Sequence, residues 1–184
     1  MTTLSTVIYT LWIIFWIGWI SVGFTSKKGT SVHRNFFTYR LFLFVLIVLV
    51  ARSVNIGGLH YYNHSGSVAK IIGSVLFAGG LGFAIWARVY LGKNWGMPMT
   101  EKEEPQLVTS GPYHFVRHPI YTGILTAVLG TALAVSYFWF VILVFSGVYF
   151  IYAAFKEEEY MHREFGKTFA KYKSSSKMLI PFIL

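Results

Sequence analysis

One polar segment stands out in a chain that is 55% hydrophobic and only 12% charged. Its sequence, TSGPYHFVRHPIYTG, occupies residues 109–123 and leads directly into an apolar run. Pro119 suits the first position of a helix, where its missing N–H costs nothing, and it biases the preceding His118 away from helix. We therefore expect a helix to begin at Pro119, with Arg117 and His118 at its positively polarised end and Tyr121 in its first turn. Arg, His and free backbone N–H groups at one point are typical of an anion site.

Three consecutive glutamates lie beyond the last long apolar run. Glu159 is explained by a solvated helix face, because Arg163 follows it at the i, i+4 spacing of a favourable pair. Two apolar runs separate the polar segment from the glutamates, and the break near Ser136 is so short that they must form an antiparallel hairpin. The hairpin brings Glu157 and Glu158 close to the start of the first run, so that both signs of charge should meet at one site.

Membrane anchoring is the simpler interpretation of the polar segment, with an Arg and a His at a cytoplasmic helix end and tyrosines in the aromatic belt. That interpretation is sufficient for Arg117 taken alone. Anchoring does not, however, require the two prolines and two glycines that fix the backbone of the segment. A site with both signs of charge instead suits a ligand that carries both, with a part that must reach the bilayer.

Hydrophobic helices are the elements that must position these residues. A helix needs roughly 20 mostly apolar residues to span a bilayer, and runs near or above that length recur along the chain. The five candidate spans are about residues 4–24, 36–56, 68–91, 119–135 and 137–155. The third contains Gly73, Gly79, Gly80 and Gly82, small residues that let helices approach closely in lipid. The sequence predicts an all-α integral membrane protein of one domain, with three spans in residues 1–91 and a C-terminal helical hairpin in residues 92–184.

Lysine and arginine alternate between the predicted loops. They occur in the first loop, in the connector before the hairpin and in the tail, whereas residues 57–67 and the break near Ser136 have none. The positive-inside rule then places the N-terminus outside and the connector and tail in the cytoplasm. The net charge of +9 follows from this topology, so the expected partner is the lipid bilayer and no nucleic acid is required. The chain has no cysteine, which excludes disulfides and thiolate metal sites, and we expect no metal.

The motifs of the C-terminal half resemble those of the isoprenylcysteine carboxyl methyltransferase family, with the related phospholipid methyltransferases. The similarity extends over about residues 91–181 and comprises LVTSGPYHFVRHPIYTG, a hairpin, EEEYMHREFGKTFAKY and a closing IP. The resemblance implies a methyltransferase that uses S-adenosyl-L-methionine, of the short prokaryotic type, in the cytoplasmic membrane. It also implies that residues 92–184 are the catalytic half, with a cofactor pocket facing the cytoplasm.

Individual site residues follow from the same resemblance. Those expected to contact the cofactor are Gln106, Leu107, Val108, Tyr113, His118, Pro119, Ile120, Tyr121, Glu157 and Glu158. The acid pair of the family aligns on Glu157 and Glu158, because Phe165-Gly166 sets the register. Arg117 and His118 are expected to be catalytic: Arg117 suits the cofactor carboxylate, and His118 can also accept a proton from the acceptor.

The methyl acceptor is left open by three departures from the family pattern. Pro105 replaces a frequent His, Phe169 replaces the first Tyr of a Tyr-x-x-Tyr pattern, and Ala153 replaces an Arg that eukaryotic members use toward the substrate. The lipophilic acceptor is therefore a carboxylate, an amine or a thiol. Two alternatives to methyl transfer are an NADPH-dependent membrane reductase of the sterol-reductase type and a non-enzymatic membrane scaffold.

The predicted topology can be tested by labelling. Cysteines introduced singly at Ser65 and Ser174 should react from opposite sides of sealed vesicles, because the loop around residue 65 lacks cations and the tail is rich in them. The measurement is modification by a membrane-impermeant thiol reagent before and after permeabilisation. Modification of both positions from one side would contradict five spans.

Overall fold

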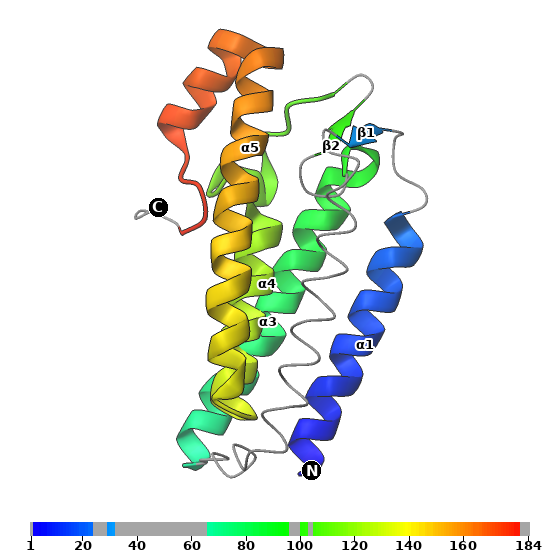
Figure 1. The fold of residues 1–184 in the computed structure, drawn as a ribbon, viewed down its shortest axis with the longest axis vertical. Coiled ribbons are helices and arrows are strands. Elements are labelled where there is room, and N and C mark those ends of the chain that lie inside the picture. Colours follow the sequence, from blue (N-terminus) through cyan, green and yellow to red (C-terminus); the bar gives the residue numbers. More distant parts are fainter. Residues whose placement is uncertain (1, 24–28, 32–65, 96–99, 103–104, 181–184) are drawn as a thin grey trace.

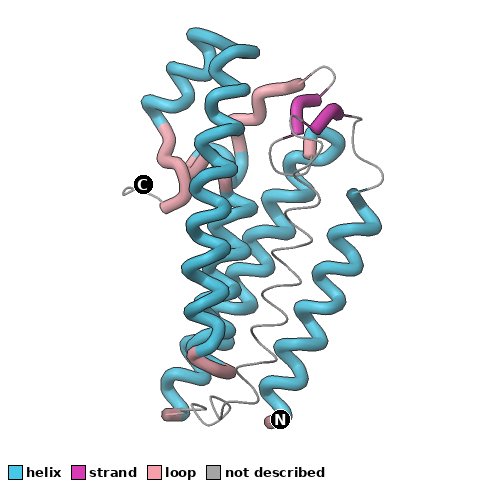
Figure 2. Tube along the Cα trace, viewed as in Figure 1, coloured by secondary structure: helices cyan, strands magenta, loops and turns pink. Residues whose placement is uncertain are grey.

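Four helices make up most of the computed structural model, which describes residues 2–23, 29–31, 66–95, 100–102 and 105–180. These helices are α1 (Thr3–Gly23), α3 (Ser67–Leu91), α4 (Pro119–Ala134) and α5 (Phe138–Ser175). Two short 3-10 helices, η2 (Gly92–Asn94) and η3 (Gly111–His114), and an antiparallel pair of strands, β1 (Gly29–Ser31) and β2 (Thr100–Lys102), complete the described elements. The helices run side by side along the long axis (Figure 1), and the strands lie near one end of the bundle (Figure 2). The expected helical architecture is confirmed for the described residues.

Apolar surface faces outward on the longer helices. By length and composition α3 and α5 can each cross a membrane, whereas the apolar parts of α1 and α4 are shorter. Large exposed apolar side chains include Val68, Ile71, Val75 and Val89 on α3 and Val141, Val144, Phe145 and Val148 on α5. Such surfaces favour membrane association. The count of five spans stays a prediction, because the expected span 36–56 lies outside the described residues.

Helices α3 and α4 pack backbone against backbone. A Cβ added at Gly80 would lie 2.5 Å from the amide nitrogen of Ala127 and 2.6 Å from the carbonyl oxygen of Gly123. A Cβ added at Gly130 would lie only 2.3 Å from the amide nitrogen of Phe77. These distances are far below van der Waals contact, so the two helices can approach this closely only because hydrogen atoms replace side chains.

Only some of the glycines in α3 make this contact. Gly73 and Gly80 face α4, which confirms their expected role in close helix packing. At Gly79 and Gly82 an added Cβ would meet no atom of the described residues within 4 Å, so close packing at these two positions stays a prediction. They lie one or two positions from a buried glycine and therefore point to another face of the helix.

Trp12 joins α1 to the hairpin. Its indole Nε1 donates a buried hydrogen bond to Thr131 Oγ1 of α4 at 3.1 Å. Its ring stacks on Trp139 of α5 with centroids 6.0 Å apart. A buried Trp usually finds a partner for its N–H, and here that partner is the fully buried Thr131.

The long helix α5 reverses direction near its end. Gly166 has φ 48° and ψ −119°, in a left-handed region that favours glycine and interrupts the helical backbone. After this residue the chain folds back beside the first part of α5 (Figure 1). We call residues 167–175 the return arm and residues 176–180 the tail. This reversal, which the sequence reading did not predict, brings the tail to the start of α4.

The α3–α4 contact gives a test with an internal control. Gly130→Ala should lower the free energy of unfolding by about 1–3 kcal/mol, because the new methyl group collides with backbone atoms of α3. Gly82→Ala should leave stability unchanged or raise it by up to about 1 kcal/mol, since alanine favours helix and has space there. The measurement is the unfolding transition in detergent, followed by tryptophan fluorescence. Equal effects of the two substitutions would rule out this packing.

Candidate functional site

The polar segment begins by packing against the end of α3. Gly111 has φ 59°, and a Cβ there would lie 2.6 Å from the ring of Tyr90, so the turn requires glycine. The Tyr90 hydroxyl donates to Ser110 Oγ at 3.0 Å. Tyr113 is buried in η3, and its hydroxyl lies 3.4 Å from the carbonyl oxygen of Ala87, to which it donates. These contacts fix the segment before it reaches the start of α4.

The tail binds the polar segment along its backbone. The N–H of Arg117 donates to the carbonyl of Lys177 at 2.8 Å, and the N–H of His118 donates to the carbonyl of Met178 at 3.1 Å. One turn into α4, Thr122 Oγ1 donates to the next tail carbonyl at 2.6 Å. The N–H groups of Arg117 and His118, which precede the helix, are therefore satisfied by the tail. The expected anion contact at the helix-start N–H groups beyond Pro119 stays a prediction. Helix α4 does begin at Pro119, as the proline predicts.

Glu158 lies between two cations. Arg117 Nε donates to Glu158 Oε1 at 2.6 Å, with side-chain exposures of 8% and 4%. Lys173 Nζ lies 2.7 Å from Glu158 Oε2, and Arg117 Nη1 also donates to the carbonyls of Lys173 and Ser176. Burial acts to raise the pKa of Glu158, but hydrogen bonds from His118, Lys173 and Arg117 outweigh it and lower the pKa to about 2.

Glu157 occupies a different environment on the same turn of α5. Its Oε1 accepts a hydrogen bond from the Tyr121 hydroxyl at 2.6 Å, and its Oε2 lies 3.3 Å from His118 Nδ1. His118 Nε2 lies 3.6 Å from Glu158 Oε1. The Tyr121 ring stacks between His118 and Phe150, with centroids 5.4 and 4.5 Å apart. With 25% of its side chain exposed, Glu157 is the more accessible carboxylate of the pair.

The two carboxylates shift the titration of His118. Burial acts to lower the pKa of His118, but its contacts with Glu157 and Glu158 outweigh burial and raise the pKa. The site therefore presents a buried imidazole beside two carboxylates and a guanidinium. Both signs of charge meet where the hairpin argument predicted them. Glu159 lies outside this cluster, exposed and paired with Lys156 at 3.0 Å.

The connector supplies the other expected cofactor contacts. The side-chain oxygen of Gln106 accepts a hydrogen bond from Asn94 Nδ2 at 2.9 Å. Arg88 fixes the start of the connector, since its guanidinium lies 4.2 Å from the centre of the Trp95 ring and donates to the carbonyl of Gly92. The remaining expected residues are Leu107 and Val108, half-buried in the connector, and Pro119 and Ile120, buried in the first turn of α4.

Sequence reasoning missed the return arm as part of the site. Lys173 was counted only as one of the cytoplasmic charges, and Tyr172 only as the remainder of a family pattern. In the structure the Tyr172 hydroxyl donates to the carbonyl of Tyr113 at 2.5 Å, and burial raises the pKa of Tyr172 to about 12. Gly166, between a helix and a Lys-rich segment, is the signal that could have predicted a helix end and a reversal.

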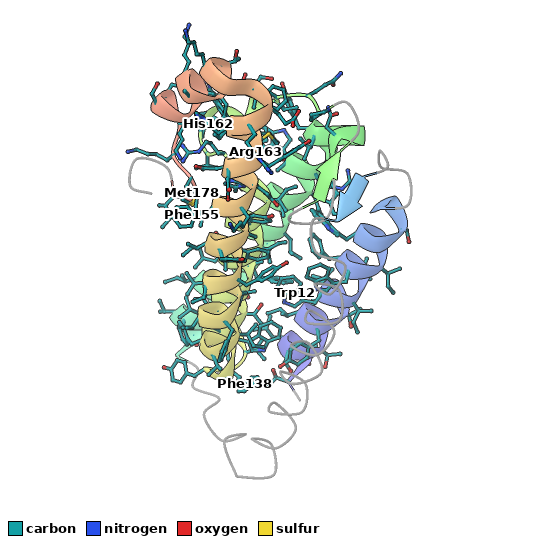
Figure 3. All side chains as sticks on the ribbon, turned by 45° about the horizontal axis from the view of Figure 1, so that its top comes forward. Trp12, Phe138, Phe155, His162, Arg163 and Met178 are labelled. Atoms are coloured by element: carbon teal, nitrogen blue, oxygen red, sulfur yellow. The ribbon has the colours of Figure 1, made fainter. Side chains whose placement is uncertain are left out.

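A pocket of about 280 Å³ opens between the two parts of α5, next to Glu158. The residues lining it are Phe155, Glu158, Glu159, His162, Phe169 and Lys173. Figure 3 shows Phe155 and His162 on the first part of α5. Glu158 therefore borders both this pocket and the charged cluster that contains His118.

Comparison with known families gives one match. The model of a family described as phospholipid methyltransferase matches residues 68–168, which is more than half of the chain. The matched region includes α3, the connector, the polar segment, α4 and most of α5. No curated protein matches the chain.

The environment of Glu158 predicts a dependence of stability on pH. Its folded pKa, about 2, lies below the ordinary 4.5, so its ionised form stabilises the fold fully above about pH 4.5 and loses that effect as pH falls toward 2. Glu158→Gln should therefore lower the unfolding temperature at about pH 7, with a difference from the unaltered protein that narrows below about pH 4. Glu159→Gln is the exposed control and should have little effect throughout. A difference in unfolding temperature that stayed constant at all pH values would contradict the lowered pKa of Glu158.

Proposed function

The chain belongs to the phospholipid methyltransferase family, and we propose that it transfers a methyl group from S-adenosyl-L-methionine to a lipophilic acceptor at the cytoplasmic face of the membrane. Family membership confirms the resemblance inferred from the sequence and implies a methyltransferase acting on lipid-like molecules. The observation that carries the finer proposal is the cluster in which Arg117, His118 and Tyr121 meet Glu157 and Glu158. Lysines and arginines of the connector and of residues 156–177 support the cytoplasmic orientation, and we place the protein in a prokaryotic cytoplasmic membrane.

The chemistry of the cluster fits the proposed cofactor. S-adenosylmethionine carries a carboxylate, an ammonium group, a ribose diol and a sulfonium. Glu157, the more exposed carboxylate, can accept hydrogen bonds from the ammonium or the diol. His118, with its raised pKa, supplies a positive charge toward the carboxylate. The further proposed contacts are Gln106, Leu107, Val108, Tyr113, Pro119, Ile120, Tyr121 and Glu158.

Positioning is the main demand of this reaction. The cofactor supplies an electrophilic methyl group when bound, and displacement from sulfur is in line, so the protein has to orient the two reactants. The stacked rings of Tyr121 and Phe150 and the clamped backbone of residues 117 and 118 provide rigid walls. The carboxylates raise the pKa of His118, which works against a proton-accepting role unless its contact with them weakens during turnover.

The acceptor is proposed only by class. Family membership points to a lipid-like molecule, and its nucleophile is a carboxylate, an amine or a thiol. Ala153, the position at which eukaryotic carboxyl methyltransferases carry an Arg, is fully buried in α5. Nothing in the described residues favours the reductase or the scaffold, and the family match favours methyl transfer over both.

Cofactor binding by the purified protein is the test. The unaltered protein should bind S-adenosylmethionine or its demethylated product in calorimetry, and Glu157→Ala should weaken that binding roughly 10- to 150-fold, the typical loss of a charged hydrogen bond. Glu159→Ala, exposed on the same turn and paired with Lys156, is the matched control and should bind normally. Binding of NADPH without any response to S-adenosylmethionine would instead support the reductase.

A further inference from the structure

Lys173 contacts both members of the buried ion pair. Its ammonium nitrogen lies 2.7 Å from Glu158 Oε2, and its carbonyl oxygen accepts a hydrogen bond from Arg117 Nη1 at 3.3 Å. It reaches this position only because the chain reverses at Gly166, whose positive φ suits no other residue type. A residue remote in sequence from the polar segment therefore closes the cluster from the side opposite His118.

These contacts give the two carboxylates of the acid pair different partners and different exposure. Glu158 is 4% exposed and ionised, and a buried charge of this kind is costly unless it is paired. Arg117 occupies one of its oxygens and Lys173 the other. Glu157 faces Tyr121 and His118 instead and keeps a larger exposed surface. Two cations are therefore directed to the carboxylate that is less accessible to a ligand.

We propose that Lys173 is a positioning residue of the methyl-transfer site, which acts through Glu158 and touches neither cofactor nor acceptor. By holding Glu158 against Arg117, it fixes the start of α4 and with it the placement of His118. Glu157 is then the member of the acid pair that offers the cofactor the more accessible carboxylate. This inference rests on the proposed function, because it assigns a task within the same site.

A lysine that contributed only positive charge at the cytoplasmic face would not depend on a particular partner, as Lys173 does. The side chain of Lys173 is 52% exposed, and ion pairs between two exposed groups contribute little to stability. The partner here is buried, however, and removing one side of such a pair leaves an uncompensated charge. Lys171 lies on the same arm, is also exposed and carries the same charge. Among the ion pairs of the described residues, Glu158 pairs with Lys173 and not with Lys171.

The first measurement is cofactor affinity by calorimetry in detergent. Lys173→Met should weaken binding of S-adenosylmethionine about tenfold, because Glu158 loses one of its two cations. Lys173→Arg should restore affinity to within about threefold, since it keeps the charge. Lys171→Met is the matched control and should bind like the unaltered protein. If Lys173→Met does not fold, Lys173→Gln, which keeps an N–H donor toward Glu158, takes its place.

A double-mutant cycle separates action through Glu158 from a direct effect. In a Glu158→Gln background, Lys173→Met should cause less than about a twofold further loss, because the charge on which it acts is gone. Fully additive losses would overturn the proposal, as would equal effects of Lys171→Met and Lys173→Met or normal affinity in Lys173→Met. Failure of the unaltered protein to bind S-adenosylmethionine would overturn the proposed function itself and this inference with it.

Discussion

A buried carboxylate at the end of a hydrophobic hairpin is the constraint on which the site depends. Glu158 is almost fully enclosed and carries a pKa of about 2, so the fold must bring cations to it. One comes from the polar segment before α4 and the other from the return arm after Gly166. Three segments that are distant in sequence are thereby joined at one point, and the hydrogen bonds between the tail and the polar segment follow from their proximity.

Close packing of α3 and α4 determines where that point lies. The interlocked glycines, among them Gly80 and Gly130, bring the two helix backbones into close contact, so α4 cannot slide or rotate without backbone collision. The first turn of α4 carries Tyr121 and follows His118 directly. The packing of α3 and α4 in the middle of the bundle thus fixes the His118 and Tyr121 side chains, which face Glu157 at one end of the bundle.

Local signals in the sequence were sufficient for part of this arrangement. Pro119 predicts the start of α4, and the short break near Ser136 predicts the hairpin that brings Arg117 to Glu158. Gly166 could have indicated the helix end, but the course of the return arm beyond it depends on tertiary contacts that no periodicity encodes. For the same reason the bonding of the Arg117 and His118 N–H groups to the tail could not be foreseen.

The boundary between apolar and charged surface on α5 connects this geometry to a lipophilic acceptor. Exposed apolar side chains continue along the helix to Phe155, which is 56% exposed, and the acid pair follows within one turn. If α5 crosses the bilayer, its charged cluster lies at the headgroup boundary, because ionised groups are excluded from the hydrocarbon. A charged cofactor from the aqueous side and a lipid-like acceptor from the bilayer would both reach that level. The position of Glu157, accessible and next to the last apolar turn, is the one that the proposed reaction of two reactants of opposite solubility would need.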